Sequence, residues 1–218
     1  MTQPPLFHLQ GVHFAYDGDH KVLTGADFVL RTGEKVALCG ANGAGKTTLF
    51  HLMVGLVIPQ AGSVQAFGAP CRREVDFHPV RARTGLLFQD SDDQLFCPTV
   101  IEDVAFGPLN QGHSRAQARA QAVEALALVG LSGFDDRVTH KLSGGQKRLV
   151  ALATILAMKP QVLLLDEPTN GLDRDARARL MRILDGLPQT LMVISHDDDA
   201  LAALTTRRVT LENGLLSG

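Results

Sequence analysis

The feature that most constrains this chain is a glycine-rich stretch at residues 40–48, GANGAGKTT. It fits the pattern G-x-x-x-x-G-K-[ST], in which backbone N–H groups and a lysine surround a polyphosphate. The apolar run at 35–39 predicts a strand buried on both faces, directly before the loop. Apolar residues at near-helical spacing predict a helix over 46–54, which ends at Gly55. Strand, loop and helix start together aim N–H groups and a helix dipole at phosphate groups.

Each position of the loop has an expected role. Lys46 should reach the β and γ phosphates, and the Thr47 hydroxyl should bind Mg²⁺. The residues that we expect to contact the nucleotide here are Gly40, Asn42, Gly43, Ala44, Gly45, Lys46, Thr47 and Thr48.

Composition narrows the class of protein. A chain of 218 residues with 45% hydrophobic and 20% charged residues predicts one globular domain. The net charge of −2 offers no broad basic field for nucleic acid. No apolar stretch approaches the roughly 20 residues of a membrane helix, and no signal region opens the chain. The three cysteines show no paired spacing, which suits a reducing compartment.

The N-terminal part predicts strands. Leu6–Tyr16 alternates loosely and predicts an edge strand, with a turn at 16–19 and a second strand over Val22–Leu30. Tyr16 is the only tyrosine of the chain, and its ring either stacks on a nucleotide base or merely covers the sheet.

The middle of the chain predicts helices. A buried strand over Thr84–Phe88 ends at Gln89, and Thr99 with Glu102 predicts a capping box. Ser114 is expected to cap the next helix, which should end at Gly130. Its predicted inward stripe consists of Ala116, Ala120, Val123 and Ala127.

A second chemical stretch is Leu142–Gln146, LSGGQ, which we name the signature segment. Ser143 and Gln146 match a capping box at a helix start. Gly144 and Gly145 are poor helix formers, at about 1 kcal/mol each relative to alanine. They leave backbone amides unshielded, as an anion site requires, so capping and phosphate binding can coexist here.

Two strands should deliver acids and a histidine to the same sheet edge. The apolar run at 162–165 ends on Asp166, which is placed to hold Mg²⁺, and Glu167 can polarise a water for attack on the γ phosphate. A last core strand over Thr190–Ser195 leads to His196, as a sensor of that phosphate or as a structural side chain.

Together these stretches resemble the nucleotide-binding subunits of ATP-binding-cassette (ABC) transporters over essentially the whole chain. The residues that carry the resemblance are Gly40–Thr48, Gln89, Leu142–Gln146, Asp166, Glu167, Asp173 and His196, in the family's order, with Tyr16 where the family keeps a base-stacking aromatic.

The resemblance implies a P-loop NTPase fold of the α/β class with an ABC-type arrangement. A parallel-sheet core with an N-terminal antiparallel β subdomain would span 1–88 and 161–218, and a helical subdomain 89–160, all within one domain. ATP and Mg²⁺ are the implied cofactors. Catalytic roles fall to Lys46, Gln89, Glu167 and His196, and Mg²⁺ ligation to Thr47, Gln89 and Asp166. Nucleotide contacts in trans fall to Ser143, Gly144, Gly145, Gln146 and Asp173.

A narrower resemblance lies in Phe88–Phe96, Pro98–Val100 and Asp103–Pro108, and Ser143–Arg148 agrees with it. These stretches are similar to energy-coupling-factor transporters, most of all the ATPases of cobalt and nickel uptake. It implies a head-to-tail dimer of two copies, a transmembrane coupling subunit and a substrate-specific membrane subunit. The chain would then be a peripheral protein at the cytoplasmic face of a bacterial or archaeal membrane. Because every catalytic position is intact, we expect a homodimer with two competent sites.

One alternative function stays open and two are disfavoured. The ATPase of a vitamin-type importer remains possible, although the chain ends soon after its predicted strand at 208–211, without the C-terminal extension that many of those ATPases carry. A soluble ABC ATPase acting on nucleic acid would carry a long coiled-coil insertion or zinc cysteines. A stand-alone kinase or GTPase would not need the signature segment.

Overall fold

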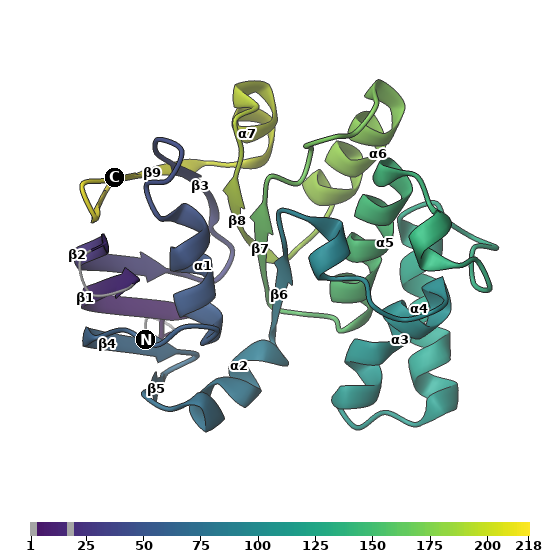
Figure 1. Cartoon of the computed structure of the whole chain (residues 1–218), viewed down its shortest axis with the longest axis horizontal. Helices are drawn as coiled ribbons and strands as arrows, with labels where there is room; N and C mark the ends of the chain where they lie inside the picture. Colours follow the sequence, from purple (N-terminus) through teal and green to yellow (C-terminus); the bar gives the residue numbers. More distant parts are fainter. Residues whose placement is uncertain (1–3, 17–19) are drawn as a thin grey trace.

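A six-stranded sheet forms the centre of the molecule (Figure 1). The computed structural model describes residues 4–16 and 20–218. Within these residues the sheet has five parallel strands, and β10 runs antiparallel at one edge. In spatial order the strands are β10 (Leu215–Ser217), β9 (Arg207–Glu212), β3 (Lys35–Cys39), β8 (Thr190–Ile194), β7 (Val162–Asp166) and β6 (Thr84–Leu87). The predicted parallel core is confirmed, and β10 is an element that the sequence analysis missed.

Strands β7 and β8 are buried along their whole length. Because successive side chains of a strand point to opposite faces, Val162 and Leu164 of β7 pack into one hydrophobic cluster and Leu163 and Leu165 into another. A strand that is apolar on both faces is typical of a parallel sheet covered by further layers on both sides.

One covering layer is an antiparallel sheet with α1 (Lys46–Val54) between it and the central sheet (Figure 1). Among the described residues its strands are, in order, β2 (His20–Leu30), β1 (Phe7–Tyr16), β4 (Ala61–Ala66) and β5 (Ala69–Cys71). Strand β1 therefore lies inside this sheet, and the predicted edge strand was wrong. Its alternation is loose because the register shifts around Gly11, which has a φ of 53°, and not because one side is unpaired. Of the predicted turn at 16–19, residues 17–19 lie outside the described residues.

Helices cover the opposite face of the central sheet, in the part of Figure 1 drawn in teal and green. They are α3 (Val100–Asn110), α4 (Arg115–Leu128), α5 (Gly144–Ala157) and α6 (Arg174–Asp185). Shorter helical elements are η1 (Glu74–Phe77), α2 (His78–Arg81), η2 (Ser91–Asp93), η3 (Thr139–Lys141) and α7 (Asp198–Leu204). No helix among the described residues combines the length and the apolar composition that crossing a bilayer requires.

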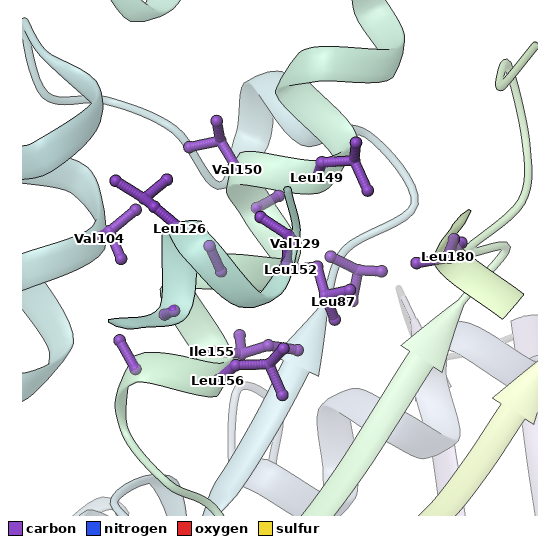
Figure 2. Packing of buried hydrophobic residues seen from close by; sticks show 14 of the residues in the cluster. Leu87, Val104, Leu126, Val129, Leu149, Val150, Leu152, Ile155, Leu156 and Leu180 are labelled. Atoms are coloured by element: carbon purple, nitrogen blue, oxygen red, sulfur yellow. The ribbon is translucent and has the colours of Figure 1, made fainter. Parts of the chain in front are cut away.

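The helical layer packs around α5, as Figure 2 shows for Leu126, Val129, Leu149 and Leu152 beside Leu87 of β6. The predicted inward stripe of α4 was wrong, because its four members are exposed. The residues of α4 that are buried instead are Ala118, Ala122, Ala125 and Leu126. Alanines recur through this helix on several faces, so the sequence pattern fits two stripes and only packing selects one. The boundary of the helical subdomain at 89–160 stays a prediction.

Gly55, directly after α1, generates a stability prediction. Its φ is 71°, and an added Cβ would lie 2.1 Å from Cγ of the fully buried Phe77. Gly33 has a similar φ of 81° with nothing within 4 Å of an added Cβ, and it provides the matched control. We expect Gly33→Ala to cost about 1–2 kcal/mol through the left-handed backbone alone. Gly55→Ala should lose roughly 1–3 kcal/mol more through overpacking, measured by urea unfolding. Equal losses in the two variants would show that Phe77 can move aside.

Candidate functional site

The loop between β3 and α1 is built around glycines that the backbone requires. Gly40, Gly43 and Gly45 have φ values of 147°, 76° and 101°, in the region that favours glycine. A Cβ at Gly45 would lie 2.3 Å from Cγ1 of Val22, and one at Gly40 would lie 2.5 Å from the carbonyl oxygen of Leu211. The loop can therefore pass this close to β2 and β9 only with glycine at these two positions.

Lys46, the first residue of α1, is buried inside this loop. Its Nζ donates to the carbonyl oxygens of Gly40, at 2.8 Å, and Ala41, at 2.9 Å. Both partners are neutral carbonyls, so the positive charge stays available to an anion that enters the loop.

The side chains of Thr47 and Asp166 meet where β7 ends. Thr47 Oγ1 donates to Asp166 Oδ2 at 2.5 Å. Burial raises the pKa of the Asp166 carboxyl, against the Thr47 hydrogen bond and the charge of Arg148, which lower it. Mg²⁺ prefers hard oxygen ligands, takes few of them from the protein and completes its shell with phosphates and water. The hydroxyl and carboxylate here fit such an ion, and Gln89 lines the same cavity.

Glu167 follows Asp166 with a strained backbone. Its φ of 47° lies in the left-handed region, a conformation that non-glycine residues seldom adopt outside functional sites. The backbone N–H of His196 donates to Glu167 Oε2 at 3.3 Å, and His196 Nε2 lies 3.5 Å from Oε1. Oε1 is buried and accepts no hydrogen bond from the described residues, so it needs a donor such as water or a ligand.

These side chains line one cavity of about 720 Å³, a size typical of small-molecule sites. The predicted site residues that line it are Tyr16, Asn42, Gly43, Gly45, Lys46, Thr47, Thr48, Gln89, Asp166, Glu167 and His196. Thr169, Asn170 and Ser195 line it as well, and the sequence analysis assigned no role to them. They follow β7 and β8 along the chain, so the rule that ligands collect at the carboxyl ends of parallel strands could have found them.

Tyr16 lies at the rim of this cavity. Its ring is 41% exposed and packs edge-on against Phe14, with ring centroids 4.8 Å apart. Its hydroxyl lies 3.3 Å from Thr48 Oγ1. The ring therefore covers part of the sheet and also borders the cavity, so its geometry is compatible with both interpretations of Tyr16.

The signature segment and Asp173 do not line this cavity. Ser143 Oγ accepts from the N–H of Gln146 at 3.3 Å, which confirms the predicted capping box at the start of α5. Asp173 Oδ1 accepts from the N–H of Ala176 and caps α6. Of the signature segment, Leu142 and Gly144 border a neighbouring hollow of about 650 Å³ that Gln89 also lines. Ser143, Gly145, Gln146 and Asp173 line neither space. One chain thus does not bring these residues to the cavity.

Arg148 is a residue whose position the sequence analysis did not interpret. It lies on α5 with only 3% of its surface exposed, and it donates to backbone carbonyls of Gln89 and Asp166. Burial lowers the pKa of its guanidinium, while the carboxylates of Asp166, Glu167 and Asp90 raise it. An arginine directly before the apolar run at 149–153 was the signal for a buried cation.

The sequence of this chain is similar to those of known ATP-binding proteins. A family model described as "ABC transporter" matches residues 23–170. A putative ABC transporter ATP-binding protein of Nitratidesulfovibrio vulgaris is 49% identical over 216 residues, covering 99% of this chain and 79% of that protein. The cobalt import ATP-binding protein CbiO of Rhodobacter capsulatus is 45% identical over 214 residues, covering 96% of this chain and 76% of that protein.

Two solved structures have the same fold as this chain. CbiO1 of Clostridium perfringens, described as part of the ABC transporter complex CbiONQ, superposes with a TM-score of 0.85 at 32% identity, covering 98% of this chain and 87% of that one. The dimeric ATP-binding cassette MJ0796 bound to ADP and Pi has a TM-score of 0.88 at 26% identity, covering 97% of both chains. The predicted resemblance is therefore confirmed: the chain belongs to the family of ABC transporter ATP-binding proteins, ATPases that couple ATP hydrolysis to transport.

Proposed function

We propose that two copies of this chain form a head-to-tail dimer that hydrolyses ATP to power a metal-ion importer of the energy-coupling-factor type. The observation that carries the proposal is the first turn of α5. Gly144 is exposed, its φ is not in the left-handed region, and an added Cβ would meet nothing within 4 Å. Alanine would fit and favour the helix by about 1 kcal/mol, so the chain's own structure does not account for the glycine. A phosphate approaching the open amides from a second copy does account for it.

Within each half-site, each of these residues would have a separate role. Lys46 and the loop amides bind the β and γ phosphates, and Tyr16 stacks on the base. Thr47, Asp166 and Gln89 would hold Mg²⁺, which supplies positive charge to the phosphoryl oxygens. Glu167 orients the attacking water and takes its proton, through the carboxylate whose Oε1 accepts no hydrogen bond from the described part of the chain. His196, beside Glu167, stabilises charge that develops on the γ phosphate.

The second copy would complete each site. Ser143, Gly144, Gly145 and Gln146 of one copy close over the nucleotide held by the other, with Asp173 at the same interface. These contacts exist only in the closed dimer, so ATP favours closure and hydrolysis favours opening. The dimeric cassette bound to ADP and Pi, to which this chain is similar, supports such an assembly.

An aromatic groove beside Gln89 is the proposed docking place of the transmembrane coupling subunit. It has a volume of about 270 Å³ and includes Leu56, Phe88, Phe96, Phe106 and Met158. Phe96 is 66% exposed and packs edge-on against Phe106, 4.8 Å between centroids. Exposed apolar clusters of this kind mark sites of association. Cobalt as cargo rests on the similarity to the cobalt import ATPase and to part of the CbiONQ complex, and nickel rests on the sequence resemblance alone.

Glu167→Gln separates binding from hydrolysis. It keeps a side chain of the same shape that cannot take a proton, so we expect ATP-dependent dimerisation to persist while turnover falls about 10²–10⁴-fold. Light scattering with ATP measures the dimer, and phosphate release measures turnover. Unchanged turnover would remove Glu167 from the role of base, and a monomer at saturating ATP would contradict the composite site.

Tyr16→Ala distinguishes the two interpretations of that ring. If Tyr16 stacks on adenine, its loss weakens ATP binding by about 1–3 kcal/mol, while Tyr16→Phe keeps the ring and the affinity. Calorimetric titration of both variants with ATP provides the measurement. A ring that only covers the sheet would instead leave ATP affinity unchanged in Tyr16→Ala and lower the thermal stability.

Phe96→Glu tests the docking groove and the cargo together. The charge should prevent docking, so the variant should no longer be recovered with its membrane subunits and cells should lose uptake of radioactive cobalt or nickel. ATP-dependent dimerisation in solution should not change, because Phe96 does not line the nucleotide cavity. Val123→Glu, on the exposed face of α4, is the matched control. Retained uptake in Phe96→Glu would exclude this groove, and no metal uptake by the unsubstituted complex would exclude the proposed cargo.

A further inference from the structure

Helix α5 carries two features with opposite exposure. The signature segment lies at its start, where Ser143 and Gly144 are exposed. One turn later Arg148 points into its own chain and is almost fully buried. The two features lie on one continuous helix, joined by the hydrogen bond from Lys147 N–H to the Ser143 carbonyl at 2.9 Å.

All three guanidinium nitrogens of Arg148 donate to backbone carbonyls. Nη1 donates to Phe88, at 2.5 Å, and to Gln89, at 3.2 Å. Nη2 donates to Asp166, at 2.6 Å, and to Glu167. The carbonyl oxygen of Pro168 accepts from Nε at 3.2 Å. One side chain therefore fastens two separate segments to α5.

Those two segments carry three of the proposed site residues of the chain's own cavity. Gln89 lies two residues after β6, Asp166 ends β7 and Glu167 follows it. A shift of either segment relative to α5 would break hydrogen bonds from a buried charge, and such bonds contribute about 1.5–3 kcal/mol each. A lysine ammonium has three donors and no planar fork, so it cannot reproduce this five-carbonyl arrangement.

We propose that Arg148 is a positioning residue that makes the signature segment move together with Gln89, Asp166 and Glu167. The state of the nucleotide in one copy's own cavity is thereby transmitted to the contacts that this copy makes with its partner's nucleotide. This inference rests on the proposed composite dimer. It places the link between the two sites of that dimer inside each chain, at Arg148.

The test uses Arg148→Lys in the Glu167→Gln background, where ATP is bound and not consumed. In a dilute single chain without Mg²⁺, ATP affinity should be unchanged, because Lys46 and the loop amides then hold the nucleotide and Arg148 makes no hydrogen bond to them among the described residues. The ATP-driven dimer should dissociate about tenfold more readily, the loss expected from one hydrogen bond to a charged group. Arg81→Lys is the matched control, since Arg81 also donates to two carbonyls, those of Val54 and Gly55, away from the cavity.

The outcomes separate the alternatives. Unchanged pairing in Arg148→Lys would overturn the inference, as would equal losses in single-chain ATP binding and in pairing, which indicate a general structural role. Failure of the Glu167→Gln chain itself to pair would overturn the composite dimer and this inference with it.

A measurement on the unsubstituted chain covers the case in which Arg148→Lys does not fold. ATP with Mg²⁺ should slow amide hydrogen exchange at residues 144–148 even in a chain too dilute to pair. That protection can reach the first turn of α5 only through the chain's own interior, and its absence would overturn the inference.

Discussion

The burial of β7 on both faces is the constraint on which the site depends. With Val162 and Leu164 fixed in one hydrophobic cluster and Leu163 and Leu165 in the other, the strand can neither rotate nor slip by one residue without moving its apolar side chains out of both. Its end is therefore fixed against the start of α1, where Thr47 meets Asp166. Glu167 then leaves the sheet with a left-handed backbone that this packing enforces.

The buried charges of the site are held mostly by the backbone. Lys46 and Arg148 donate to carbonyls rather than to the carboxylates beside them, and Asp166 takes its hydrogen bond from a neutral hydroxyl. Closed ion pairs would have satisfied these groups at the expense of a ligand's charge, since a paired lysine attracts a phosphate less. Glu167 goes furthest in this direction, because its buried Oε1 accepts no hydrogen bond from the described residues. The arrangement keeps charge and acceptor capacity available at the cost of some stability.

The sequence predicted best those parts of the structure that depend on interactions between residues close together in the chain. The bounds of α1 and the capping boxes at Thr99 and Ser143 depend on residues at most four apart, and all are confirmed. The interior place of β1 depends on its pairing with β4, about fifty residues away, and the buried face of α4 depends on helices on either side in sequence. The contacts of Arg148 join residues up to sixty positions apart. Motifs indicated the candidate site residues, while the fold decides that some of them line the chain's own cavity and others do not.

Helix α5 connects three regions of the molecule. Its first turn presents the signature segment, and its second holds Gln89 and Asp166 through Arg148. Its third turn binds Gln94, whose Nε2 donates to the Ala151 carbonyl at 2.9 Å and to Thr154 Oγ1 at 2.8 Å. Ile155, near its end, lines the aromatic groove beside Phe96. A packed helix of this length, about 21 Å, transmits displacement rather than absorbing it. A partner seated in the proposed groove would therefore act on the same rigid element that would complete the second copy's site in the proposed dimer, which would link docking, nucleotide binding and hydrolysis without any further moving part.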